Sequence, residues 1–140
     1  MVREVLITWM ISLVVSLSAS AEDEIGGVSF HIGSDETMNL ALRQITRHFE
    51  MNKSTPIRVF LVADGVKPAL EGAKDENGGY FTAQMEQLLA SGIRIFACEN
   101  TLIHLGKSTE DLAFGIETIT SGIAELGRLQ VDENWAYIKL

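Results

Sequence analysis

The sequence predicts an α/β protein built on a mostly parallel sheet of about five strands, with helices on both faces. Two observations support this fold class. Short apolar runs alternate with segments whose apolar residues recur every three or four positions, as strands alternate with helices in such proteins. The run Ile57–Ala63 is almost continuously apolar, which is typical of a strand buried on both faces of a parallel sheet.

The first predicted strand, Val28–Ile32, alternates apolar and polar residues before Gly33-Ser34 turns the chain. Ser34 is placed to cap a helix, with Asp35 and Glu36 in its first turn, where negative charge suits the helix dipole. The helix then shows one apolar face, formed by Met38, Leu42, Ile45 and Phe49. A break is predicted at 52–56.

The second strand, Ile57–Ala63, ends at Asp64-Gly65, and a long polar loop is expected up to residue 79. A helix over residues 80–90 follows, and Ser91-Gly92 provides its stop. Ile93–Ala97 is the third strand. The middle of the chain thus repeats the order of strand, connection and helix that a parallel sheet requires.

Elements in the last third of the chain are marked by capping residues. Ser108 and Asp111 resemble a capping box. Residues 116–120 are a fourth, weaker strand, and Ser121 can cap a helix over residues 122–131. Trp135–Ile138 is the closing strand.

Residues 1–21 have the pattern of a secretory signal peptide. The apolar stretch Val5–Leu17 is shorter than the roughly 20 residues that a membrane-spanning helix needs. Ala19-Ser20-Ala21 has the small-x-small form of a cleavage site. An uncleaved anchor is the alternative. Either way we expect residues 22–140 to form a single exported domain, periplasmic or secreted, with no membrane segment after the signal is removed.

Composition and missing motifs exclude several functions. A formal net charge of −8 disfavours binding to nucleic acid or anionic lipid. The GxxxxGK and GxGxxG patterns of nucleotide-binding loops are absent, as is the GxSxG turn of serine hydrolases. With three scattered histidines and one cysteine, we predict no metal and no cofactor.

Cys98 is the only cysteine, and it follows the third strand directly. Ligands of α/β proteins bind outside the carboxyl ends of the strands, so a reactive thiol is expected at this position. A helix N-terminus after the strand would favour the thiolate, whereas Glu99 would oppose it if its side chain pointed at the sulfur. The alternative is a small buried side chain without chemistry.

Five further residues are candidates to support Cys98. Asn100, or the backbone N–H groups of Asn100 and Thr101, would stabilise an anionic sulfur, although both residues can also cap the following turn. Asp64 and Gly65 belong to the same predicted edge of the sheet and are expected to line the site, but Asp64 can equally be a turn residue that supports Gly65. His104 is either a base for Cys98 or, more simply, a surface or core residue.

Several of these segments together resemble the DsrE/DsrF-like family. They run in the same order as in that family and comprise 57–66, 88–92, Ile93–Leu102 with its Ala-Cys-Glu-Asn-Thr-Leu ending, 121–126 and 130–138. The resemblance implies a compact α/β domain that assembles into homo-oligomers, often trimers or hexamers. Some members relay sulfur as a cysteine persulfide, and several others have no established activity.

One departure from the family concerns Asp64-Gly65, because many relatives carry His-Gly there. A histidine can shuttle protons near neutral pH, and an aspartate mostly cannot. A mechanism that needs a base in this loop is therefore put in doubt.

Two functions follow from these observations. The first is an exported sulfur carrier that accepts sulfane sulfur as a persulfide on Cys98 and passes it to a partner thiol, which implies a sulfur donor and a sulfur acceptor protein. The second is a non-enzymatic oligomeric binding or assembly module with a small-ligand cleft near Cys98. The sequence leaves open whether the protein is an enzyme.

Overall fold

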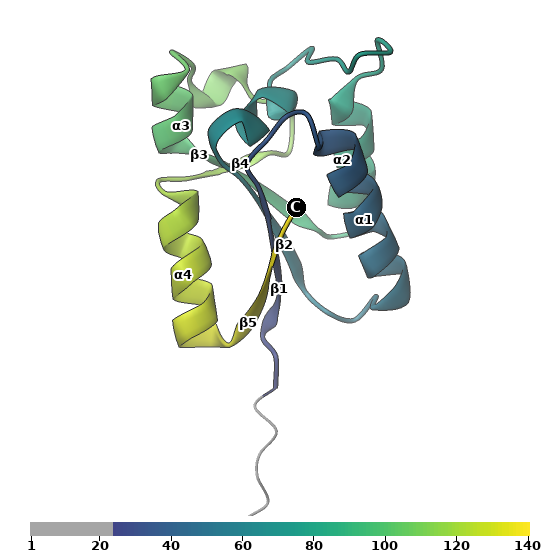
Figure 1. The fold of residues 1–140 in the computed structure, drawn as a ribbon, viewed down its shortest axis with the longest axis vertical. Helices are drawn as coiled ribbons and strands as arrows, with labels where there is room; N and C mark the ends of the chain where they lie inside the picture. Colours follow the sequence, from purple (N-terminus) through teal and green to yellow (C-terminus); the bar gives the residue numbers. More distant parts are fainter. Residues whose placement is uncertain (1–23) are drawn as a thin grey trace, which may run out of the picture.

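The computed structural model describes residues 24–140, and the predicted signal peptide, residues 1–21, lies outside them. The described chain contains a five-stranded sheet in the order β4-β3-β2-β1-β5, in which every neighbouring pair is parallel (Figure 1). The strands are β1 (Gly27–Ile32), β2 (Ile57–Leu61), β3 (Arg94–Cys98), β4 (Glu117–Ile119) and β5 (Trp135–Lys139). The predicted fold class is confirmed.

Helices lie on both faces of this sheet. The α-helices are α1 (Met38–Met51), α2 (Phe81–Ala90), α3 (Glu99–His104) and α4 (Gly122–Glu133), and two 3-10 helices are η1 (Ala63–Ala69) and η2 (Thr109–Asp111). Figure 1 shows α1 and α2 on one side of the sheet and α4 on the other. Among the described residues, no helix combines the length and apolar character needed to cross a membrane.

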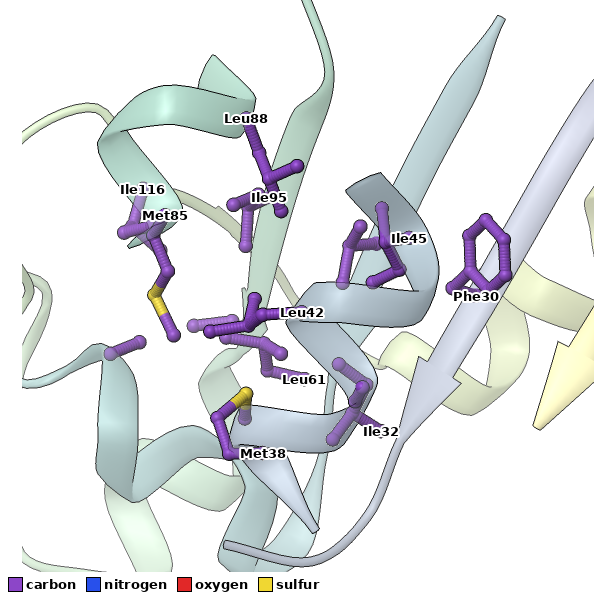
Figure 2. Packing of buried hydrophobic residues seen from close by; sticks show 14 of the residues in the cluster. Phe30, Ile32, Met38, Leu42, Ile45, Leu61, Met85, Leu88, Ile95 and Ile116 are labelled. Carbon is purple, nitrogen blue, oxygen red and sulfur yellow. The ribbon is translucent and has the colours of Figure 1, made fainter. Parts of the chain in front are cut away.

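The larger part of the core fills the space between the sheet and helices α1 and α2. Strand residues such as Ile32, Leu61 and Ile95 meet Leu42 of α1 and Met85 of α2 there, all of them at most 1 % exposed (Figure 2). Burying each such side chain contributes about 1.5–3 kcal/mol to the stability of the fold.

A smaller cluster lies under α4. The rings of Phe60 and Phe96 stack there with centroids 5.2 Å apart, and Leu126, Leu129 and Trp135 complete the cluster. Two packed faces explain why β2 is apolar at nearly every position, as its sequence predicted.

Two local predictions were wrong. Helix α1 begins at Met38, and Ser34 does not cap it; instead, the Ser34 hydroxyl accepts a hydrogen bond from the Glu36 N–H in the preceding turn. The segment after β2 begins not as a polar loop but as η1, because apolar residues such as Val66 and Ala69 are buried against the core.

Two capping predictions were confirmed. The Ser121 hydroxyl accepts a hydrogen bond from the Ala124 N–H at 3.3 Å, so Ser121 is the N-cap of α4. The Ser108 N–H donates to Asp111 Oδ2 at 2.8 Å, as in a capping box, before η2. The Ser121 cap matters most for the site below, because it fixes where α4 begins.

Candidate functional site

Cys98 lies where β3 ends and α3 begins, at the carboxyl edge of the parallel sheet. It is the last residue of β3 and the N-cap residue of α3, and it pairs in register with Ile119 of β4. Its side chain is 6 % exposed and forms no disulfide. The thiol therefore sits just beneath the surface, at the end of the sheet where ligands usually bind.

Several hydrogen-bond donors surround the sulfur. Burial by itself raises the pKa of the Cys98 thiol, but donors oppose this effect. These donors are the backbone N–H groups of Gly122, Thr101 and Asn100 and the hydroxyl of Thr101, and together they hold the pKa below its ordinary value. The Asn100 N–H is shared, because it also donates to the Thr120 carbonyl oxygen at 3.3 Å. Among the described residues, the groups that lower this pKa are neutral hydrogen-bond donors, and no cationic side chain contributes.

The Thr101 hydroxyl is oriented by a strained backbone. Its oxygen accepts a hydrogen bond from the Ala63 N–H at 3.1 Å, which leaves the hydroxyl hydrogen available to the sulfur. Ala63 adopts a left-handed conformation with φ +48°, which costs an alanine about 1–2 kcal/mol. The end of β2 therefore helps to aim a hydroxyl on α3 at Cys98.

Gly122 lets the first turn of α4 approach the sulfur. A Cβ atom at this position would lie 2.6 Å from Cγ1 of Val62 and 3.7 Å from Cβ of Cys98. Only a residue without a side chain fits here without displacing its neighbours. The N-terminus of α4 thus adds an N–H group, and the positive end of its dipole, to the surroundings of the thiol.

The two acidic residues expected near Cys98, Glu99 and Asp64, each have another partner. Glu99 accepts a hydrogen bond from the Thr120 hydroxyl at 3.2 Å. Asp64, in the first turn of η1, pairs with Lys67 at 2.8 Å. The expected conflict between Glu99 and a thiolate is thereby reduced, because the carboxylate is held by another partner.

A surface depression of about 600 Å³ opens beside Cys98. Three segments that are distant in sequence line it, namely the end of β2, the start of α3 and the start of α4. The lining residues are Val62, Ala63, Cys98, Asn100, Thr101, His104, Ser121 and Ile123. The depression is large enough for a small organic ligand or the side chain of a partner protein.

The predicted site residues fall into two groups. Asn100 and Thr101 lie with Cys98 in the lining of the depression, whereas Asp64 is exposed and faces Lys67. Gly65 is buried against the end of β1, where an added Cβ would collide with the carbonyl oxygen of Ile32. Gly65 therefore has a packing role: it lets η1 lie against the sheet.

Sequence reasoning missed Ala63 and Gly122, which act through backbone N–H groups. In the sequence, Gly122 is marked only by its position directly after the N-cap Ser121. A glycine there leaves the start of α4 without a side chain. Within residues 24–140, no three histidine, cysteine, aspartate or glutamate side chains gather in a way that could hold a metal ion.

Comparisons with known proteins agree with this architecture. The model of the DsrE/DsrF-like family matches residues 25–140. The solved structure of MTH1491 from Methanobacterium thermoautotrophicum, a protein of unknown function, is 28% identical with a TM-score of 0.72, and the match covers 81% of this chain and 97% of that one. No curated protein matches the chain.

Two more distant structures support the fold alone. The ychN protein from E. coli is 22% identical with a TM-score of 0.68, over 81% of this chain and 99% of that one. BT1422 from Bacteroides thetaiotaomicron, a conserved protein of unknown function, is 19% identical with a TM-score of 0.61, over 82% and 95% of the two chains.

Proposed function

Because the chain belongs to the DsrE/DsrF-like family, we propose that it is a sulfur carrier that holds sulfane sulfur as a persulfide on Cys98. The observation that supports this most directly is the set of donors around the sulfur, from Gly122, Thr101 and Asn100. Thiol–disulfide chemistry requires a thiolate, and these donors favour that form.

The transfer consists of two displacements at sulfur. The Cys98 thiolate attacks the outer sulfur of a donor persulfide R–S–SH, forming a new S–S bond while the old bond breaks and R–S⁻ leaves. A thiolate of the acceptor then attacks the outer sulfur on Cys98 and displaces the Cys98 thiolate. Sulfane sulfur moves from donor to acceptor, and the two steps need no oxidant or reductant.

The burial of Cys98 suits a persulfide better than it suits a bare thiol. Cys98 is 6 % exposed, so an approaching acceptor protein has little access to the Sγ atom of Cys98. A persulfide adds an outer sulfur about 2 Å beyond the first. Since Cys98 lines the depression, that outer atom would extend into it, within reach of an acceptor.

Mass measurement on the intact protein tests this function. We expect incubation with polysulfide to add the mass of sulfur to the protein, and the substitution Cys98→Ser to abolish the addition, because the only thiol is lost. Treatment with a reducing thiol should reverse it. No adduct with any sulfur donor would contradict the carrier function.

A non-covalent binding module is the second candidate, and the low exposure of Cys98 is the observation that favours it. In that case the depression holds a small ligand or a partner loop, and the cysteine only packs. An unreactive Cys98 together with measurable ligand binding, unchanged by Cys98→Ser, would support the module.

We also propose that the protein is exported through residues 1–21 and works outside the cytoplasm as a homo-oligomer, a trimer or hexamer. The proposal for export rests on the apolar stretch and the Ala-Ser-Ala site in the sequence. The proposal for assembly rests on the resemblance to the family. A sedimentation profile of a strict monomer would contradict assembly.

A further inference from the structure

The depression beside Cys98 has a polar end and an apolar wall. Its polar end is the group of N–H and hydroxyl donors at the sulfur. Its wall includes Val62 and Ala63 from the segment after β2, and Ile123, which is 57 % exposed, from α4. Most of the depression's surface is apolar, so a bound molecule would place its hydrophobic part against this wall.

Within residues 24–140, the lining of the depression contains no lysine or arginine, and His104 is its basic side chain. Two basic side chains on the adjoining elements are already paired: Lys67 lies 2.8 Å from Asp64, and Arg128 lies 2.6 Å from Glu125. The formal net charge of −8 further weakens the attraction of small anions. A dianion would therefore find donors at the sulfur, but no lysine or arginine among the described lining residues to bind its other end.

We infer that Cys98 takes its sulfur from a donor that carries an apolar group on the far side of its sulfane sulfur, in preference to a small, highly charged donor such as thiosulfate. This inference rests on the proposed carrier function and concerns the class of donor. The sulfane sulfur would meet the donors around Cys98, and the apolar group would lie against Val62 and Ile123.

Three matched compounds test the inference, namely thiosulfate, methanethiosulfonate and benzenethiosulfonate. In each, the Cys98 thiolate attacks the terminal sulfur, the new S–S bond forms, and sulfite or the corresponding sulfinate leaves with the electrons of the broken bond. The rate of adduct formation, followed by intact mass, is divided by the rate of the same compound with free N-acetylcysteine. This ratio removes the intrinsic reactivity of each donor.

We expect the corrected rate for benzenethiosulfonate to exceed that for thiosulfate by about tenfold or more, which corresponds to about 1.4 kcal/mol. Ile123→Lys should make the corrected rates for benzenethiosulfonate and thiosulfate similar, because it replaces an apolar side chain of the wall with a cationic one. Ile103→Lys is the matched control: Ile103 is 73 % exposed on α3 and lines a neighbouring depression instead. That variant should keep the wild-type preference.

The outcomes separate this inference from the proposed function. Adducts that form from all three compounds at equal corrected rates, or a preference that Ile123→Lys leaves unchanged, would overturn the inference alone. A preference lost equally in Ile103→Lys would assign it to overall charge and would also overturn it. No adduct from any compound would overturn the carrier function, and the inference with it.

Discussion

Cys98 is a buried thiol whose pKa is lowered by neutral groups of the fold. Burial raises its pKa, and donors from Gly122, Thr101 and Asn100 outweigh that effect. A hydrogen bond to a charged group contributes about 1.5–3 kcal/mol, so a few of them can offset the loss of solvent around a thiolate. The sulfur also lies 3.8 Å from the Thr120 carbonyl oxygen, which the neutral thiol can use as an acceptor.

The substitution Thr101→Val tests the contribution of a single donor. It removes the hydroxyl that serves the sulfur and also leaves the Ala63 N–H without its acceptor. We expect the pKa of Cys98 to rise and its rate of alkylation at pH 7 to fall by about tenfold. The pH dependence of alkylation by iodoacetamide measures both.

Thr101→Ser is the control, because it keeps the hydroxyl and removes only a methyl group. Its alkylation profile should stay close to that of the wild-type protein. If Thr101→Val and Thr101→Ser shift the profile equally, the hydroxyl does not stabilise the thiolate, and the backbone donors alone are responsible.

At the scale of elements, the site forms where three chain segments end or begin. β2 ends at Leu61 and leads to Ala63, β3 ends at Cys98, and α4 begins at Gly122. Parallel strands bring their carboxyl ends to one edge, and the helices that follow present free N–H groups there. The approach of α4 depends on Gly122, since a Cβ there would press on Val62.

Two glycine-to-alanine substitutions within α4 should have opposite effects. Gly122→Ala would place a Cβ 2.6 Å from Val62 Cγ1, and we expect it to destabilise the protein by about 1–3 kcal/mol and to raise the pKa of Cys98. At Gly127 an added Cβ meets nothing within 4 Å, so Gly127→Ala should stabilise the helix by up to about 1 kcal/mol.

Urea unfolding measures the stabilities of both variants, and alkylation against pH measures the thiol. Gly127→Ala should leave the thiol unchanged, because it alters the helix away from its N-terminus. An unaltered thiol in Gly122→Ala would show that the start of α4 does not set the reactivity of Cys98.

For the whole molecule, His31 couples global stability to pH. His31 lies on β1 and is 8 % exposed, with its Nδ1 2.7 Å from the hydroxyl of Tyr137 on β5. Burial and, to a lesser degree, the charge of Lys139 lower its pKa from the ordinary 6.5. The folded state thus holds a neutral histidine that the unfolded chain protonates more readily.

We therefore expect the His31 contribution to stability to be fully present above pH 6.5 and to be lost as the pH falls below this value towards the lowered pKa of the folded state. His31→Gln keeps a polar side chain that does not titrate. Urea unfolding at about pH 7.5 and about pH 5 compares the two proteins. Equal losses of stability in both would show that His31 does not contribute to the acid sensitivity.

The order of elements could be predicted from the sequence because each depends on local physics. The apolar run of β2, the helical spacing in α1 and the Ser121 cap are properties of short segments, and all appear in the structure. Ser34 failed as a cap because the turn around it satisfies its hydroxyl before the helix begins at Met38.

The candidate site was predictable only in part, and the division has a physical reason. Cys98, Asn100 and Thr101 adjoin one another in sequence, so the end of a strand was enough to place them together. Tertiary structure alone decided the other partners: the Gly122 N–H acts on the sulfur directly and the Ala63 N–H acts through the Thr101 hydroxyl, and every residue but proline carries such an N–H group. Asp64 was predicted near Cys98 but does not contribute to the site, because its carboxylate pairs with Lys67 of the same helix, η1.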